Sequence, residues 1–166
     1  QIRLAELLGV RAAVSDPLIS GITIDSRLVR PGDLYVALSG AHHHGAEFAQ
    51  QAAAAGAVAI LTDPAGSQLA PEVVVPVVVV EHPRQAMAAV AATIYGRPAD
   101  ALTMCAVTGT NGKTTTTFLL EAALRAGGVS TGLVGTVGFR LNGVALDCVP
   151  TTVTTPESTD LQGLLA

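Results

Sequence analysis

The sequence LTMCAVTGTNGKTTTTFLL, residues 102–120, guides the interpretation of the whole chain. Residues 102–107 form an apolar run, which predicts a short strand buried on both faces. Residues 108–112 are rich in Gly, Thr and Asn and predict a turn, and the residues from Lys113 onward favour a helix. A helix N-terminus has unpaired backbone N–H groups and the positive end of the helix dipole. The strand, turn and helix therefore predict a phosphate-binding loop.

Lys113 strengthens this interpretation because it is the only lysine in the 166 residues. Its compact ammonium can lie between two phosphate groups, and the hydroxyl of Thr114 suits Mg²⁺. The match to the pattern G-x-x-x-x-G-K-[ST] is incomplete, since Val107 stands where the first glycine belongs and a glycine follows only at Gly109. The order of strand, glycines, lysine and hydroxyls nevertheless favours a nucleotide site over an ordinary glycine-containing turn.

Composition narrows the class of protein. Hydrophobic residues make up 49% of the chain and aromatic residues 3%, so a core must be built from Val, Leu, Ile and Ala. A net charge of −4 without a basic block argues against nucleic acid as a partner. No apolar run approaches the roughly 20 residues of a membrane span, and no signal peptide is visible, which favours a reducing cytoplasm. Cys105 and Cys148 suggest no disulfide framework, and we expect Cys105 to be buried as a small apolar residue.

Hydrophobic patterning before residue 97 predicts a small α/β domain. Strands are expected at residues 20–26, 34–38 and 58–61, and helices at 2–10, 46–55 and 84–95. Residues 73–80 are predicted to be an edge or interrupted strand, because Pro76 cannot donate a hydrogen bond to a sheet. Gly96, Arg97 and Pro98 mark the expected boundary between a domain of residues 1–97 and a second of residues 98–166.

The second domain begins with the phosphate-loop strand. Its first helix is expected to end at Gly127 and Gly128, and a strand follows at residues 130–135. Asn142-Gly143 predicts a hairpin turn within residues 139–146. Residues 149–155 are polar and extended, and Pro156 and Glu157 predict the start of another helix.

Three segments together resemble a known family. Residues 108–116, TGTNGKTTT, resemble the ATP-binding loop of the Mur ligases and the related folylpolyglutamate synthetases, which join a carboxylate to an amine through an acyl phosphate. Residues 24–40, with IDSR and PGDLYVA, resemble the N-terminal domain of the Mur ligases. GTVGFR at 135–140 and TTPE at 154–157 resemble most closely the family member that adds the third peptide residue.

The resemblance implies roles for individual residues. Lys113 is the expected catalytic residue, and Thr114 the expected Mg²⁺ ligand. The residues expected to hold ATP are Gly109, Thr110, Asn111, Gly112, Lys113, Thr114 and Thr115. Those expected to hold the UDP-MurNAc-peptide substrate are Ile24, Ser26, Ala41, His42, His43, Thr154 and Thr155.

Residues 42–44 are three adjacent histidines, which do not converge on one metal ion as i, i+4 helical histidines do. We interpret this segment as a solvated loop, with uridine contact as its functional alternative. The family often has Asp where His44 stands, so the sequence departs from the family pattern there.

The expected fold is α/β, with a small N-terminal UDP-binding domain followed by the start of a P-loop parallel-sheet ATPase domain. The expected ligands are ATP, Mg²⁺, UDP-MurNAc-L-Ala-D-Glu and a diamino acid, bound by a monomer. We expect the 166-residue chain to be inactive by itself. The family's second metal glutamate, carbamylated lysine and amino-acid-binding domain would lie beyond Ala166. The alternatives are the ligase of the next step, a folylpolyglutamate synthetase, or a nucleotide-binding module without catalysis.

Overall fold

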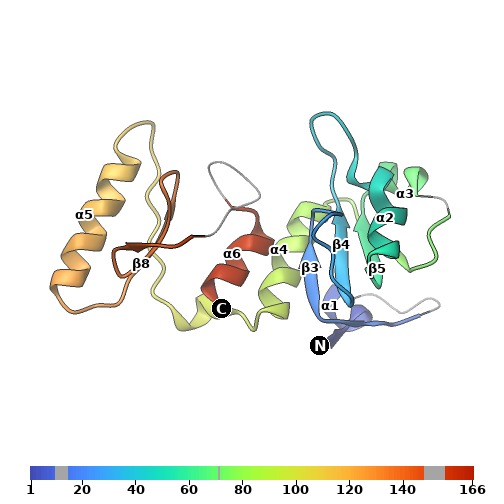
Figure 1. Ribbon diagram of the computed structural model, residues 1–166, viewed down its shortest axis with the longest axis horizontal. Helices are drawn as coiled ribbons and strands as arrows, with labels where there is room; N and C mark the ends of the chain where they lie inside the picture. The colour runs from blue at the N-terminus through green and yellow to red at the C-terminus, as the bar shows by residue number, and fades with distance from the viewer. Residues whose placement is uncertain (10–14, 71, 148–155) are drawn as a thin grey trace.

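The computed structural model describes residues 1–9, 15–70, 72–147 and 156–166. Two regions lie at opposite ends of the molecule, with helices α4 (Pro83–Ile94) and α6 (Ser158–Leu165) between them (Figure 1). One region is built on a parallel sheet, and the other on helix α5 (Lys113–Ala126) and an antiparallel sheet. The α/β fold class with a parallel sheet, predicted from the sequence, is confirmed.

The parallel sheet has four strands that follow one another in space as they do in the chain. They are β3 (Gly21–Thr23), β4 (Asp33–Ala37), β5 (Ala59–Thr62) and β6 (Val77–Val79). Strand β6 lies at one edge, as Pro76 predicted, and the Pro76 carbonyl still accepts a hydrogen bond from the Ile60 N–H at 2.9 Å. The carboxyl ends of all four strands meet at the same edge of the sheet because all four run in parallel.

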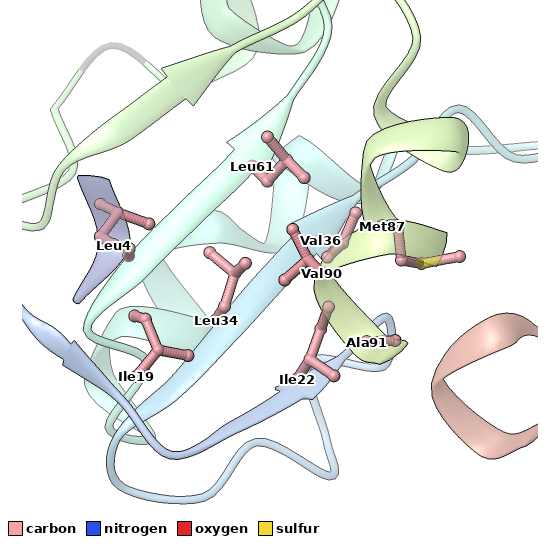
Figure 2. Packing of buried hydrophobic residues seen from close by; sticks show 10 residues of the cluster. Leu4, Ile19, Ile22, Leu34, Val36, Leu61, Met87, Val90 and Ala91 are labelled. Atoms are coloured by element: carbon pink, nitrogen blue, oxygen red, sulfur yellow. The ribbon is translucent and has the colours of Figure 1, made fainter. Parts of the chain in front are cut away.

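Both faces of this sheet are covered, so the central strands are buried throughout. Leu34, Val36 and Leu61 face helix α4, where they pack against Met87 and Val90 (Figure 2). Tyr35, Ala37 and Ile60 alternate with them along the strands and pack on the opposite face. The elements of that opposite face are η1 (Gly45–Phe48), α2 (Ala49–Ala54) and α3 (Pro64–Leu69).

The N-terminal residues differ from the expected helix at 2–10. Strand β1 (Ile2–Arg3) pairs antiparallel with β2 (Leu18–Ile19), and helix α1 is confined to Leu4–Leu8. Helix α1 ends at Gly9, whose φ of 63° places it in the left-handed region that favours glycine. Helix α3 was not predicted, although Asp63 followed by Pro64 is a cap-and-proline helix start.

Antiparallel pairing organises the second region. After the short helix η2 (Pro98–Ala101) and α5, three strands form a sheet: β7 (Gly132–Gly135), β8 (Gly138–Leu141) and β9 (Val144–Ala145). Asn142 and Gly143 have φ of 50° and 82° and connect β8 to β9, so the predicted hairpin turn is confirmed.

The predicted buried strand at residues 102–107 is wrong. These residues form no strand, and Leu102 and Met104 are 47% and 57% exposed. Cys105 is an exposed free thiol rather than a buried apolar residue. A buried parallel strand needs neighbouring strands to take its backbone hydrogen bonds. Among the described residues, β7 pairs with β8 and no strand pairs with this segment.

Candidate functional site

The phosphate-loop candidates are together at the N-terminus of α5. Gly112 is the N-cap of the helix with φ of 79°, and no side chain of the described residues caps the first turn. The N–H groups of that turn therefore have no side-chain acceptor, and a bound anion can take that place. Gly109 has φ of 145°. Both glycines are required by backbone conformation, because L-residues rarely adopt either value.

The side chain of Lys113 bends back over this loop. Its Nζ donates to the Gly109 carbonyl at 2.6 Å and to the Thr110 carbonyl at 3.5 Å. Thr110, Asn111 and Thr115 are exposed beside it. The ammonium therefore lies at the loop, where a phosphate could replace the two carbonyls as its partner.

Thr114, the expected metal ligand, has its Oγ1 3.4 Å from Oγ1 of Thr136, in the turn between β7 and β8. A neutral hydroxyl oxygen is a hard donor, and Mg²⁺ keeps several waters and takes few protein ligands besides substrate phosphates. The exposed Thr114 hydroxyl at the helix N-terminus thus fits Mg²⁺ held jointly with a nucleotide. Thr136 was not identified as a candidate from the sequence.

An ion pair with a buried carboxylate holds the hairpin against α5. Arg140 Nε donates to Glu121 Oε2 at 3.1 Å, and the Glu121 carboxylate also accepts from the Gly143 N–H at 3.1 Å. Glu121 is 6% exposed, and the Arg140 guanidinium lies over the Phe118 ring at 4.9 Å. These contacts join the middle of α5 to the β8–β9 hairpin. They therefore fix the position of the antiparallel sheet, including the β7–β8 turn, relative to the phosphate loop at the N-terminus of the same helix.

The first-region candidates lie at the carboxyl edge of the parallel sheet. Ile24 and Ser26 follow β3, and Ile24 packs partly buried against the core. Ser26 is 8% exposed, and its Oγ donates to Gln51 Oε1 at 3.4 Å. Beside it, the carboxylate of Asp25 accepts from Arg27, whose guanidinium lowers the pKa of that carboxyl.

The loop after β4 presents three of the other candidates at the same edge. Ala41, His42 and His43 are exposed, and the Gly40 N–H donates to the His43 carbonyl at 3.0 Å across the loop. His43 Nδ1 lies 3.1 Å from Glu47 Oε2, which ties the imidazole to the following helix. The prediction of a solvated loop is confirmed for these three residues.

His44 does not share that exposure, and the expectation of a solvated triplet is wrong for it. Its side chain is 11% exposed, because the ring packs between η1 and α3. The Ala46 N–H donates to Nδ1 at 3.1 Å, so Nε2 carries the proton and donates to Asp63 Oδ1 at 3.1 Å. Asp63 also accepts from the Gly66 N–H, and these two bonds lower the pKa of its carboxyl.

Thr154 and Thr155 lie outside the described residues. Glu157, two residues after Thr155, is the N-cap of α6 and pairs with Arg84 in the first turn of α4. The sequence patterns did not identify this pair, because residues 73 positions apart carry no local signal.

Among the residues that the structure describes, no group of three or more His, Cys, Asp or Glu side chains could hold a metal ion. Within the same residues, no helix is both long enough and apolar enough to cross a membrane.

A parallel α/β sheet followed by a glycine loop at a helix N-terminus is an arrangement typical of nucleotide-binding α/β proteins. Two family models match the chain: "Mur ligase family, catalytic domain" over residues 18–95 and "Mur ligase middle domain" over residues 107–166. The chain therefore belongs to the Mur ligase family.

Two curated relatives show which members of the family the chain is similar to. The chain is 52% identical over 163 residues to the UDP-N-acetylmuramoyl-L-alanyl-D-glutamate--2,6-diaminopimelate ligase of Streptomyces coelicolor, covering 98% of this chain and 31% of the relative. It is 44% identical over 151 residues to the UDP-N-acetylmuramyl-tripeptide synthetase of Roseiflexus sp., covering 90% and 29%. The chain thus spans about a third of the length of these relatives.

A solved structure agrees with these relatives. A UDP-N-acetylmuramoyl-L-alanyl-D-glutamate--2,6-diaminopimelate ligase superposes with a TM-score of 0.75 at 26% identity, covering 99% of this chain and 32% of that one. The arrangement of both regions therefore has a counterpart in a member of the same family.

Proposed function

We propose that the protein to which this chain contributes is an ATP-dependent ligase of peptidoglycan precursor synthesis. It would add 2,6-diaminopimelate to UDP-MurNAc-L-Ala-D-Glu. The observation that carries this proposal is the uncapped N-terminus of α5, with the chain's only lysine as its first residue. The choice of diaminopimelate rests on those relatives, 43–52% identical, whose names specify it.

The proposed reaction has two steps. The D-Glu carboxylate attacks the γ-phosphorus of ATP, which releases ADP and forms an acyl phosphate. The amine of the incoming residue then attacks the acyl carbon, forms the amide and displaces phosphate. The loop N–H groups and Lys113 would stabilise negative charge on the transferring phosphoryl group. Bound Mg²⁺ would supply further charge neutralisation, with Thr114 as a ligand.

Residue roles follow the same proposal. Residues 109–115 would hold ATP. Ile24, Ser26 and the loop of residues 41–43 would hold the uridine nucleotide, because they gather at the carboxyl edge of the parallel sheet, where α/β folds bind ligands. Thr154 and Thr155 would contact the MurNAc-peptide. We also propose that the protein is a monomer in the cytoplasm.

Replacement of Lys113 tests the phosphate loop. In the full-length gene product, Lys113→Ala should lower ATP-dependent phosphate release by about 100-fold or more, because a preorganised donor to the transition state is lost. Arg125→Ala, in the last turn of the same helix, is the matched control and should retain activity. Phosphate release by Lys113→Ala within a few-fold of wild type would contradict the assignment.

A substrate comparison tests the reaction itself. The full-length product should release ADP over repeated turnovers only with UDP-MurNAc-L-Ala-D-Glu and an amino-acid acceptor present, and it should prefer meso-diaminopimelate to L-lysine. Preference for a folate or for the tripeptide substrate would instead identify a folylpolyglutamate synthetase or the ligase of the next step. Nucleotide binding without any turnover would identify a non-catalytic module.

A further inference from the structure

His44 is the last residue of the loop that carries the uridine candidates of residues 41–43. This loop lies between β4 and η1 and projects beyond the carboxyl edge of the parallel sheet (Figure 1). Ser39 and His44 form an antiparallel bridge across its base, and the Gly45 N–H donates to the Leu38 carbonyl at 2.8 Å. The loop is therefore closed at residue 44, and the position of His44 determines where residues 41–43 lie.

The imidazole of His44 joins two helices that follow different strands. Its Nδ1 accepts from the Ala46 N–H at 3.1 Å, which caps η1 after β4. Its Nε2 donates to Asp63 Oδ1 at 3.1 Å, and the same oxygen accepts from the Gly66 N–H at 2.7 Å in α3, which follows β5. Because both ring nitrogens are bonded, only one orientation of the ring keeps both bonds.

Gly66 provides the space for this ring. A Cβ at residue 66 would overlap Cε1 of His44 and Oγ1 of Thr62. Glycine within a helix is less favourable than alanine, so the close approach of the ring and the hydroxyl explains its presence in α3. The His44 side chain is thus part of the packing between the two helices.

The bond to Asp63 extends the support of the loop beyond its own helix. The His44 N–H donates to Glu47 Oε1 at 3.0 Å, and this contact lies within η1. Asp63, in contrast, comes directly after β5, the neighbouring strand of the sheet. The imidazole therefore relates the loop to two adjacent strands rather than to β4 alone.

We propose that His44 is a positioning residue that holds the loop of residues 41–43 in the conformation that receives the uridine end of the substrate. This inference rests on the proposed function, because it takes residues 41–43 as part of that site. His44 is not a catalytic residue, since its ring nitrogens are bonded within the protein. A loop that is fixed before binding loses less conformational entropy when the nucleotide arrives, so His44 should contribute to affinity for that nucleotide.

The first test uses steady-state kinetics of the full-length gene product. His44→Ala should raise KM for UDP-MurNAc-L-Ala-D-Glu by about three- to tenfold, the range expected when one neutral hydrogen bond is lost. KM for ATP and kcat should stay within about twofold, because the phosphate loop lies in the other region. An unchanged KM for the UDP-sugar, or an equal rise in KM for both substrates, would overturn the proposal.

His82→Ala is the matched control for removal of an imidazole. His82 lies at the N-cap of α4, where it is exposed and, within the described residues, makes no side-chain cap bond. The variant should therefore change none of these constants. A rise in KM equal to that of His44→Ala would show that the effect does not depend on the bonds of His44, and would overturn the proposal.

A shorter polar side chain separates the bond to α3 from the cap of η1. In His44→Asn the amide oxygen can still accept from the Ala46 N–H, because Asn is a favourable N-cap residue, but the side chain is too short to reach Asp63 as well. A rise in KM for the UDP-sugar should therefore remain in this variant. Full recovery of the wild-type KM would assign the effect to the cap alone and overturn the bridge.

A double-variant cycle tests whether His44 and Asp63 act through one bond. Asp63→Ala should also raise KM for UDP-MurNAc-L-Ala-D-Glu, and the rise in the double variant His44→Ala, Asp63→Ala should be smaller than the product of the two single rises. Asp63→Asn keeps an oxygen that can accept from both N–H groups and should stay close to wild type. A double variant whose rise equals the product would contradict the bridge.

UDP binding and hydrogen exchange keep this proposal distinguishable from the proposed function. The Kd for UDP, which lacks the sugar and the peptide, should rise in His44→Ala by the same factor as KM. In the free protein, the amides of Gly40 and Gly45 at the base of the loop should exchange faster in His44→Ala than in wild type. If the wild type binds UDP but does not turn over UDP-MurNAc-L-Ala-D-Glu, the proposed reaction fails, while a higher Kd and faster exchange in the variant still support the role of His44. Unchanged exchange and unchanged UDP affinity in an active enzyme would overturn this proposal alone.

Discussion

The parallel-sheet region and the phosphate-loop region differ in how they are held together. Every residue of β4 and β5 is buried, and helices cover both faces of the sheet. In α5 only Glu121 is buried, and Leu119 is 67% exposed. The first region therefore depends on extensive apolar packing. In the described part of the second region, the polar contact between α5 and the hairpin is accompanied by only two buried apolar side chains of the hairpin, Leu133 and Phe139. The comparison shows that apolar residues in a helix do not by themselves indicate that the helix packs into a buried core.

Equivalent leucine truncations should give the largest difference between the two regions. Leu34→Ala removes a side chain that is 0% exposed and should destabilise the chain by about 2–5 kcal/mol. Leu119→Ala is the matched control and should cost about 0.5 kcal/mol or less. Urea unfolding followed by circular dichroism measures both, and equal losses would contradict the contrast between the regions.

The polar contact of the second region should give the next largest effect. Arg140→Met leaves the Glu121 carboxylate buried without its guanidinium and should destabilise α5 by about 1–3 kcal/mol, measured by hydrogen exchange of the helix amides. The double variant Glu121→Leu, Arg140→Met should lose less, because no unpaired charge remains. A double variant that exchanges faster than the single one would show that apolar residues cannot replace this pair.

A smaller effect is expected where His44 and Asp63 join two helices of the first region. Asp63→Ala removes the cap of α3 and the acceptor of His44, and should cost about 0.5–2 kcal/mol. Asp63→Asn keeps an acceptor for the Gly66 N–H and should cost less. Because the folded pKa of Asp63 is lowered, the wild type should lose this stability as the pH falls below about 4, whereas Asp63→Asn should not. An equal loss of stability in wild type and Asp63→Asn as the pH falls would contradict this role of Asp63.

The smallest effect concerns the buried hydroxyl of Tyr35. It donates to the Gly45 carbonyl at 2.9 Å, so Tyr35→Phe should cost about 0.5–1.5 kcal/mol near neutral pH. Burial, and then the charge of Asp25, raise the pKa of Tyr35 to about 12. Since an unfolded tyrosine ionises near 10, this contribution is complete below about pH 10 and is lost as the pH rises toward 12. Urea midpoints of wild type and Tyr35→Phe should converge over that interval, and a constant gap would contradict the assignment.

Local patterns predicted much of the fold because their causes are local. Pro76 placed β6 at an edge through its missing N–H, and Asn142-Gly143 predicted the hairpin through its left-handed conformations. The prediction of a buried strand at residues 102–107 was wrong because hydrophobicity indicates a tendency toward burial, whereas burial itself requires neighbouring strands and helices. The prediction of solvent exposure was wrong for His44 because its hydrogen-bond acceptor, Asp63, caps helix α3, which the sequence analysis did not identify.

The sequence by itself determined the α/β class and the family, and it predicted a phosphate loop at Lys113, because glycines, a lysine and hydroxyls act there through neighbouring backbone groups. Tertiary structure decided which carboxylate meets which arginine. Glu121 meets Arg140 and Glu157 meets Arg84 only after helices and strands have packed. An ion pair depends on distances of a few ångströms between side chains far apart in the chain, and residue order alone does not contain those distances.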